Sequence, residues 1–204
     1  EGKLAEQYRK DPNADLHTFA ANLMSEKAGR VVIRDYAKTM SFGILYGAGP
    51  KKISEMLGIP YNEAKQLIDL YKSEVAPGLD KVNNDLMTRY KIRAPFSTIG
   101  GRLVKGEPPK IINGKLMNFG FKSLNTLIQG SGADMAKQAM IDYWKIAEDS
   151  RLLLSLHDEL IISARADVVQ READKLAACM INAFTLDVPL IAEAKVGNNF
   201  SEVK

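Results

Sequence analysis

The sequence predicts an α+β protein, in which a helical subdomain is followed by an antiparallel sheet packed on helices. Three observations support this fold class. Apolar residues recur at helical spacing up to about residue 92. Short apolar runs separated by glycine or polar turns come next, and such runs are typical of strands. Two further helical stretches lie among those runs. We therefore expect two subdomains, residues 1–92 and 93–204.

The composition is that of an ordinary globular protein, with 46% hydrophobic and 26% charged residues in a chain of 204. No apolar run reaches the ~20 residues that a membrane-spanning helix needs, so no membrane partner is expected. Cys179 is the only cysteine, which excludes an internal disulfide and a paired-cysteine zinc site. The first residues, Glu1 to Lys10, are polar and show no secretory signal. The single thiol is compatible with a cytoplasmic protein. A net charge of +3 is compatible with nucleic acid but does not alone indicate it.

Turn residues divide the helical half. The run Asp11-Pro12-Asn13 predicts a turn, and Asp15 then suits the N-cap of a helix that reaches Leu23. A longer helix is expected from about Lys27 to Leu45, ended by the run 47–50. Three shorter helices are expected after it, around Ile53–Leu57, around Ala64–Tyr71 and over Leu79–Tyr90.

Strand signals begin after residue 92. Two short strands are expected around the Gly100-Gly101 turn. The apolar runs Leu152–Leu156 and Leu160–Ala164 predict a buried hairpin with a polar tip. The other expected elements are a loop at 106–109, a long helix over about 116–147, a helix whose apolar face runs from Val169 to Phe184, and a last strand at 188–196.

Four residues suited to a nucleotide recur at steps of four: Arg34, Lys38, Phe42 and Tyr46. On a helix each step turns by about 40°, so neighbouring members stay on one face. Two cations suited to phosphate come first, and two rings suited to a sugar or base follow. A nucleoside triphosphate has the matching shape, and Gly47 leaves room beside the rings. The alternative is an amphipathic helix with solvated cations and core-facing rings.

The polar tripeptide His157-Asp158-Glu159 separates the two apolar strand runs. Carboxylates beside such strands are costly to bury unless a cation compensates them. Because Mg²⁺ takes few protein carboxylates and completes its shell with water and phosphate, Asp158 is a candidate metal ligand. Adjacent residues of a strand point to opposite faces, so at most one of the two carboxylates binds directly. The alternative is a polar turn that merely faces water.

Two amides, Asn125 and Gln129, lie four residues apart and precede Gly130-Ser131-Gly132. Both can donate hydrogen bonds from one helical face. The DNA minor groove offers acceptors on every base pair, so an amide pair can check base-pair shape without reading sequence. The alternative is that these residues cap or kink a helix.

Together these patterns resemble DNA polymerase family A, the DNA polymerase I family. The match extends from about residue 11 to Val196. In the helical half, Asp15-Leu16-His17 resembles the segment whose histidine touches the triphosphate, and motif B of the fingers is matched by Arg34, Lys38, Phe42, Tyr46 and Gly47. In the second half, Thr98–Arg102 is similar to the TxxGR turn, and Asn125 with Gln129 match the family's minor-groove contacts. Leu156–Glu159 matches motif C of the palm. The resemblance implies helical fingers at 1–92 and a partial palm at 93–204, an incomplete polymerase right hand.

The implied activity is template-directed DNA synthesis from dNTPs on a primer–template. The primer 3′-hydroxyl attacks the α-phosphate and pyrophosphate leaves, assisted by two Mg²⁺ ions. The resemblance implies that the triphosphate is bound by Arg34, Lys38 and His17, and that Lys38 also protonates the pyrophosphate. It implies that Phe42 packs on the sugar and that Tyr46 guards the template-base position. Asp158 is implied to hold the metal with support from Glu159, and His157 to hold the primer terminus. The implied DNA contacts are Asn125, Gln129, Gly47, Arg102 and Lys122.

The chain departs from the family pattern in three places. Motif A, with a consensus near DYSQIELR and the second metal aspartate, is not found, so we expect activity only with an N-terminal portion or partner that carries it. Phe121 stands where many members have an arginine, although Lys122 is adjacent, and Leu103 replaces a second arginine. The run Tyr46–Gly49 is similar to phage members and hints at a viral origin, so the expected cytoplasm is that of a bacterial cell or a phage-infected host.

Two other functions remain open. One is a non-catalytic DNA- or nucleotide-binding remnant of a polymerase, and the other is a helical structural protein whose motifs are accidental. A further expectation concerns the palm sheet. Without its partner portion, the sheet should expose an edge near the hairpin strands, and this edge should favour association.

Overall fold

The computed structural model describes residues 2–203 and has the predicted mixture of helices and small antiparallel sheets. The chain divides into two compact units. Unit 1 consists of Glu1–Ser97 with Arg102–Ile128, and unit 2 of Thr98–Gly101 with Gln129–Lys204. This division differs from the boundary predicted at residue 92, because Phe96 and Leu124 pack into one buried cluster with Leu86 and Tyr90 of unit 1. Within residues 2–203, no helix combines the length and the apolar character needed to cross a membrane.

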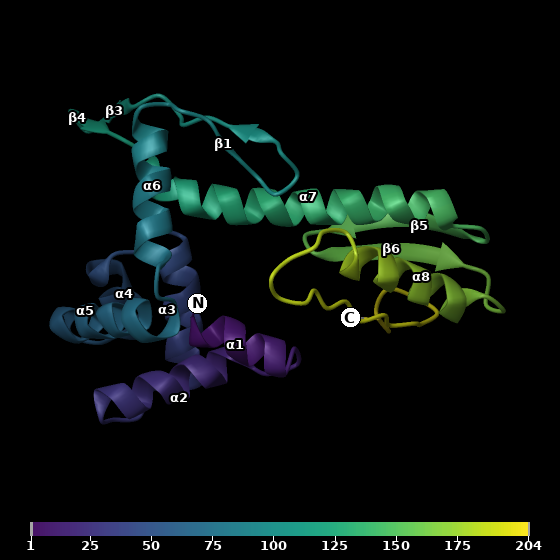
Figure 1. Ribbon diagram of the computed structural model, residues 1–204, viewed down its shortest axis with the longest axis horizontal. Coiled ribbons are helices and arrows are strands. Elements are labelled where there is room, and N and C mark those ends of the chain that lie inside the picture. Colours follow the sequence, from purple (N-terminus) through teal and green to yellow (C-terminus); the bar gives the residue numbers. More distant parts are fainter. Residues whose placement is uncertain (1, 204) are drawn as a thin grey trace. The chain divides into compact units, whose positions relative to one another are not determined.

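Unit 1 is mainly helical (Figure 1). Its helices are α1 (Lys3–Lys10), α2 (Leu16–Ala28), α3 (Arg34–Leu45), α4 (Pro50–Leu57), α5 (Tyr61–Leu70), a short π-helix η1 (Tyr71–Val75) and α6 (Leu79–Lys91). The predicted turn at 11–13, the Asp15 N-cap and the three short helices are confirmed. The helix α1 was not predicted. The core between the helices α2 to α5 and η1 includes the buried residues Met24, Met40, Ile53, Leu67 and Val75.

The predicted helix from Lys27 to Leu45 is wrong, since two helices occupy this range. Gly29 follows α2 in the left-handed conformation, at φ 66°, and this geometry ends helices. The Val32 amide then donates to the Ser25 hydroxyl over 2.8 Å, which ties the returning chain to α2. As a consequence α3 starts at Arg34, the first of the four candidate nucleotide residues.

Two hairpins follow α6. The strands β1 (Phe96–Ser97) and β2 (Leu103–Val104) form the predicted pair around the glycine turn. The strands β3 (Lys110–Ile112) and β4 (Lys115–Met117) form a second pair, which was not predicted. The expected helix start near residue 116 is therefore wrong. A 3₁₀ turn η2 (Gly120–Lys122) precedes α7 (Ser123–Ile146), because β4 occupies the residues before it.

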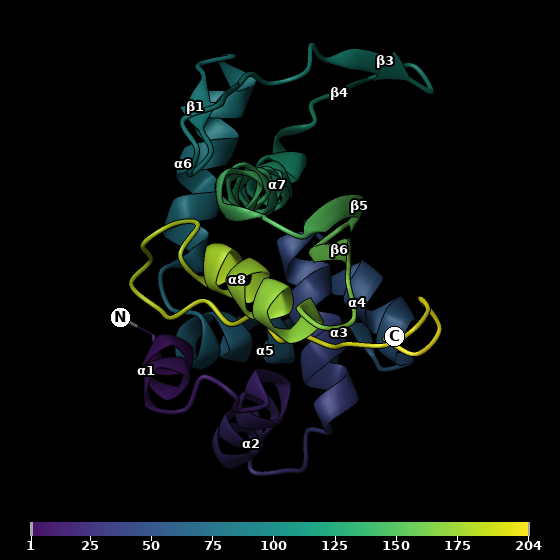
Figure 2. The same cartoon turned by 90° about the vertical axis from the view of Figure 1, so that its right-hand side faces the viewer.

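Unit 2 holds the rest of α7, the hairpin of β5 (Ser150–Leu156) and β6 (Glu159–Ala164), and α8 (Val169–Ile181). The hairpin itself is confirmed, with Leu156 paired to Glu159 and Ser150 paired to Ala164. Figure 2 shows α7 and α8 on the same side of this hairpin. The expectation of buried strands is wrong, because only one side is covered, and Leu153 and Leu154 are 59% and 46% exposed.

Two expectations for the C-terminal region also fail. Residues 188–196 form no strand, and within the described chain β5 and β6 pair only with each other. A strand needs a partner for its backbone hydrogen bonds, and this segment has none in the sheet. The helix at 169 ends at Ile181, so Phe184 lies beyond it, although Ala173 and Leu176 are buried as predicted.

A buried polar network joins α7, β5 and α8 in unit 2. The fully buried Glu172 of α8 accepts hydrogen bonds from the Ser150 hydroxyl at 2.7 Å and the Tyr143 hydroxyl at 3.2 Å. Lys175 donates to its other oxygen at 2.9 Å. These contacts hold the pKa of Glu172 at about 2, since the Ser150 and Lys175 donors stabilise the ionised form.

Candidate functional site

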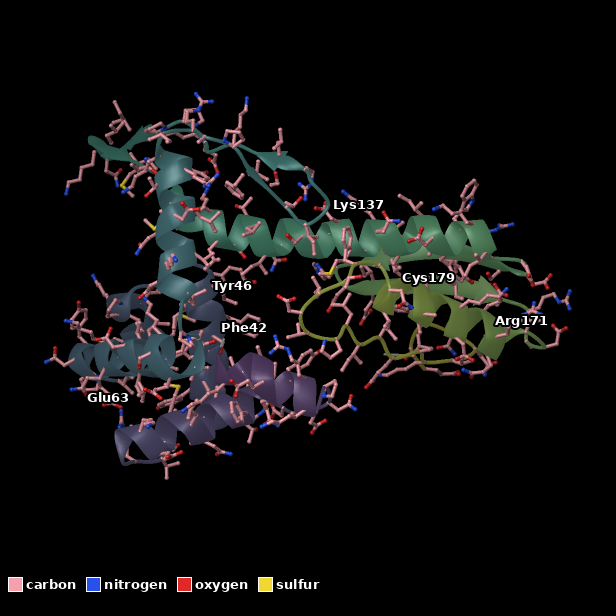
Figure 3. The ribbon with its side chains drawn as sticks, viewed as in Figure 1. Phe42, Tyr46, Glu63, Lys137, Arg171 and Cys179 are labelled. Carbon is pink, nitrogen blue, oxygen red and sulfur yellow. The ribbon has the colours of Figure 1, made fainter. Side chains whose placement is uncertain are left out.

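The four candidate nucleotide residues lie on the exposed side of α3. The side chains of Arg34, Lys38, Phe42 and Tyr46 are all exposed, and the two rings are 45% and 51% accessible. The buried side of the same helix carries Ala37, Met40, Ser41 and Ile44. Figure 3 shows Phe42 and Tyr46 extending from the same side of α3. The rings therefore do not serve the core, which removes the main support for the alternative of an ordinary amphipathic helix.

The N-terminus of α2 lies beside this exposed face. His17, which follows the N-cap residue Asp15 by two positions, contacts Phe42 with ring centroids 5.7 Å apart. Its pKa is lowered, first by burial and also by the charges of Arg34 and Lys38, although Asp15 opposes this. The structure thus places His17 with the residues with which it was predicted to act.

Asp15 joins α2 to the first residue of α3. One carboxylate oxygen accepts from the backbone amides of His17 and Thr18, at 3.0 and 3.3 Å, and so caps the helix. The other oxygen accepts from the Thr18 hydroxyl and from the Arg34 guanidinium Nε. The Arg34 contact in particular lowers the pKa of Asp15, so the carboxylate is ionised at neutral pH. The Nε of Arg34 is engaged by Asp15, and one terminal nitrogen lies 3.9 Å from a carboxylate oxygen of Asp35.

Gly47 closes α3 in a conformation that other residues rarely adopt. Its φ is 81°, and a Cβ added there would lie 3.0 Å from the Phe121 carbonyl oxygen. Glycine is therefore required both by the backbone angle and by the space. Phe121, which departs from the family pattern, is the residue that fills this position beside Gly47.

The predicted TxxGR turn rests on α7. The Ile99 amide donates to the Ser131 hydroxyl at 3.1 Å, and the Gly100 amide donates to the Asp134 carboxylate at 3.3 Å. A Cβ at Gly100 would lie 3.0 Å from the Asp134 side chain, so a larger residue would require Asp134 to shift by a few tenths of an ångström. Arg102 follows this turn with an exposed side chain.

The predicted DNA-contact residues on and before α7 differ in their surroundings. Asn125 is half-buried and Gln129 is exposed, one helical turn apart. Lys122 forms an ion pair with Glu107 at 3.0 Å, and its ammonium lies 4.6 Å from the Phe119 ring centroid. The Lys122 ammonium is therefore engaged by Glu107 and the Phe119 ring in this structure.

The hairpin tip in unit 2 presents the predicted carboxylate to solvent. His157 adopts a left-handed conformation, with φ 53°, and with Asp158 forms the two-residue turn between β5 and β6. Glu159 is the first residue of β6, and all three side chains are exposed. No group of three His, Cys, Asp or Glu side chains that suits a metal is found among residues 2–203. Asp158 alone fits the habit of Mg²⁺ to take one or two carboxylates and complete its shell with water and phosphate.

Sequence reasoning missed three polar contacts around these segments: Asp15 with Arg34, Ser131 with the Ile99 amide, and Asp134 with the Gly100 amide. Asp15 had a visible signal as an N-cap, but nothing in its spacing indicates a partner 19 positions away. Ser131 and Asp134 fall one turn apart on a helix, and that spacing is common on any exposed helical face.

Comparison with known sequences relates this chain to a single protein family. Residues 1–202 match the sequence model of the family described as DNA polymerase family A. DNA polymerase I of Bacillus caldotenax is 32% identical, over 98% of this chain and 24% of that protein. DNA polymerase I of Pseudomonas aeruginosa is 31% identical, over 83% of this chain and 19% of that protein. The chain thus spans about a quarter or less of the length of these relatives.

A solved structure is similar over nearly the whole chain. It is the POL domain of Pol1 from M. smegmatis, in complex with a DNA primer-template and dNTP. The TM-score is 0.75 and the identity 28%, over 92% of this chain and 34% of that one.

Proposed function

Because the chain belongs to DNA polymerase family A, we propose that it supplies the fingers and part of the palm of a DNA-directed DNA polymerase. Its substrates would be a dNTP and a primer–template, the molecules bound to the similar POL domain. The observation that carries this proposal is the exposed face of α3. Two cations and two rings stand there in the order that a triphosphate and its nucleoside require, with His17 beside them.

The nucleotide would lie along α3. Asp15 occupies the Nε of Arg34. The two terminal nitrogens of the guanidinium would form a second, two-pronged contact with a phosphate. Lys38, one turn further, would bind the next phosphate and donate a proton to the departing pyrophosphate. Phe42, held against His17, would support the sugar, and Tyr46 would stand at the template-base position.

The reaction forms one bond and breaks one. The primer 3′-oxygen joins the α-phosphorus as the bridging bond to the β-phosphate breaks, and the leaving pyrophosphate takes up a proton. Asp158 would be one ligand of Mg²⁺, which would make the hydroxyl more acidic and stabilise charge on the phosphate oxygens. Glu159 would support this ligand, and His157 would bind the primer terminus at the same turn.

The DNA would be contacted by residues of the α7 region and the glycine turn. Asn125 and Gln129 have donors suited to minor-groove acceptors. Gly47, Arg102 and Lys122 complete the proposed set, and for Lys122 this requires release from Glu107. The need for a motif A segment from outside this chain, the phage origin and the cytoplasmic location stay predictions.

Primer extension tests the proposal. The purified chain is assayed with primer–template, dNTPs and Mg²⁺, alone and mixed with an N-terminal polymerase portion that carries a DYSxxELR-like segment. We expect extension only in the mixture. In that mixture Lys38→Ala should reduce the rate about a hundredfold, since a positioned proton donor contributes on the order of 10²-fold. Lys65→Ala, an exposed lysine of α5, is the control and should leave the rate unchanged.

Three outcomes would count against this assignment. Extension by the chain alone would contradict the role given to a missing aspartate. DNA binding without extension in any mixture would favour the non-catalytic remnant. Equal activity of Lys38→Ala and wild type would remove the nucleotide role of α3.

A further inference from the structure

The β3–β4 hairpin projects from unit 1 beyond the end of α6 (Figures 1 and 2). Its turn consists of Asn113 and Gly114, both left-handed with φ 50° and 73°, so the ribbon has a tight two-residue end. All six strand residues are exposed. An isolated hairpin of this size is at best marginally stable in water, so its projection calls for a partner.

The two faces of this ribbon differ. Residues directly opposite one another share a face, so Ile111 and Leu116 form a cross-strand apolar pair. These side chains are 76% and 72% exposed. The pairs on either side place Lys110 with Met117, and Lys115 with Ile112, on the other face. The ribbon thus combines an uncovered apolar face with two cations.

The base of the ribbon is anchored. Gly106 packs so closely on α6 that a Cβ would lie 2.4 Å from the Tyr90 carbonyl oxygen. Glu107 binds Lys122 at 3.0 Å, and both Lys110 and Lys122 lie over the Phe119 ring. These contacts fix where the two strands leave unit 1, while the tip remains open.

The surrounding charge indicates the kind of partner. Residues 86–133 contain eight Lys and Arg but a single acid, Glu107, whereas the whole chain has 28 and 25. The segment that carries the ribbon therefore accounts for more than the net charge of the chain. Such a local excess favours a polyanion rather than a neutral protein surface.

From these observations we infer that the β3–β4 ribbon is a DNA-binding arm, which lies in a groove of duplex DNA. A two-stranded ribbon fits the major groove of B-DNA, where apolar side chains can contact thymine methyl groups. Lys115, and Lys110 once released from Glu107 and the Phe119 ring, would bind the flanking phosphates. Ile111 with Leu116 would face the groove floor. The inference rests on the proposed function only in taking duplex DNA as a partner of this chain.

Salt-dependent binding tests the arm. Fluorescence anisotropy of a labelled primer–template duplex is measured with the 204-residue chain and with Lys110→Ala/Lys115→Ala over a range of salt. Each lost phosphate contact lowers the slope of log K against log salt by about 0.9. The double variant should therefore lose a slope of about 2, so that its deficit in affinity shrinks about tenfold between roughly 50 and 200 mM salt.

Matched variants separate the arm from net charge and from folding. Lys51→Ala/Lys65→Ala removes the same charge from exposed positions of unit 1 and should keep the wild-type slope. Lys110→Arg/Lys115→Arg should also keep it. Equal slopes for wild type and the alanine ribbon variant, or an equal loss in the control, would overturn the arm while DNA binding itself still supports the proposed function.

A protein partner gives a different result. If Ile111→Ser/Leu116→Ser changes the sedimentation of the chain while the lysine variant binds DNA normally, the ribbon docks on protein and the inference is wrong. If the wild-type chain binds no duplex at all, the proposed DNA partner fails together with the arm.

Discussion

The two oxygens of the Asp15 carboxylate have separate tasks. One caps α2 through the His17 and Thr18 amides, and the other holds the Nε of Arg34. Asn caps a helix about as well as Asp, but it carries no charge to pair with a guanidinium. The two tasks can therefore be separated by substitution.

Asp15→Ala should lower the Tm of the chain by roughly 4 °C, as expected for the loss of an N-cap, whereas Asp15→Asn should leave it unchanged. Differential scanning calorimetry measures both. Both variants should alter dTTP affinity, measured by titration calorimetry, because both release Arg34. If Asp15→Asn binds dTTP as wild type does, Asp15 is only a cap. Asp11→Asn, in the preceding turn, is the control.

The candidate site was predictable from the sequence where it depends on local spacing. Steps of four place Lys38 and Phe42 on one face of any helix, and burial of Ala37 and Met40 fixes that face outward. The Asp15 contact to Arg34 was not predictable, because it depends on how the chain returns after Gly29. Whether Asp158 acts with this face stays a prediction.

Residues that end helices or form turns decided which elements were predicted correctly. Gly58 ends α4 in the left-handed conformation, and Gly29 ends α2 in the same way, but Gly29 was overlooked and two helices were joined. The Asn113-Gly114 dipeptide is a strong hairpin signal, yet the helical spacing that follows it masked β3 and β4. The strand expected at 188–196 failed for another reason: pairing depends on a partner, and its own sequence does not contain that information.

The Glu172 network makes the stability of unit 2 depend on pH. The folded pKa of Glu172 is about 2, below its ordinary value of 4.5. A group whose pKa is lowered by folding stabilises the fold above its unfolded pKa, and this contribution is lost as pH falls toward the folded pKa. The contribution should be complete above pH 4.5 and disappear between 4.5 and about 2.

Glu172→Gln should therefore reduce the free energy of unfolding by about 3 kcal/mol at pH 7, because a pKa lowered by folding from 4.5 to about 2 stabilises the folded state by roughly this amount. Urea denaturation followed by circular dichroism measures it. The gap between wild type and variant should close as pH falls through this window. A gap that stays constant down to pH 2.5 or so would show that Glu172 acts through shape alone. Asp174→Asn, exposed on the same helix, is the control.

The two units bury their apolar residues to different degrees. Unit 1 surrounds the buried residues of its helices, with Met24, Met40 and Ile53 fully enclosed. Unit 2 has helices on one side of a two-stranded sheet, and the Leu153 and Leu154 side chains of this sheet are exposed to solvent. The exposed sheet edge expected from the sequence is confirmed, since β5 and β6 pair only with each other in the part of the chain described here.

This open sheet should make the isolated chain self-associate. Unpaired strand edges beside exposed leucines are templates for pairing with another chain, and charged side chains on the strand suppress such pairing. Analytical ultracentrifugation at micromolar concentrations should show species heavier than the monomer for wild type, and Leu153→Lys should shift the population to monomer. Val31→Lys replaces an even more exposed apolar residue, 82% accessible in unit 1, and should not. If both substitutions act alike, general hydrophobicity causes the association; if wild type is monomeric, the open sheet is tolerated in water as it stands.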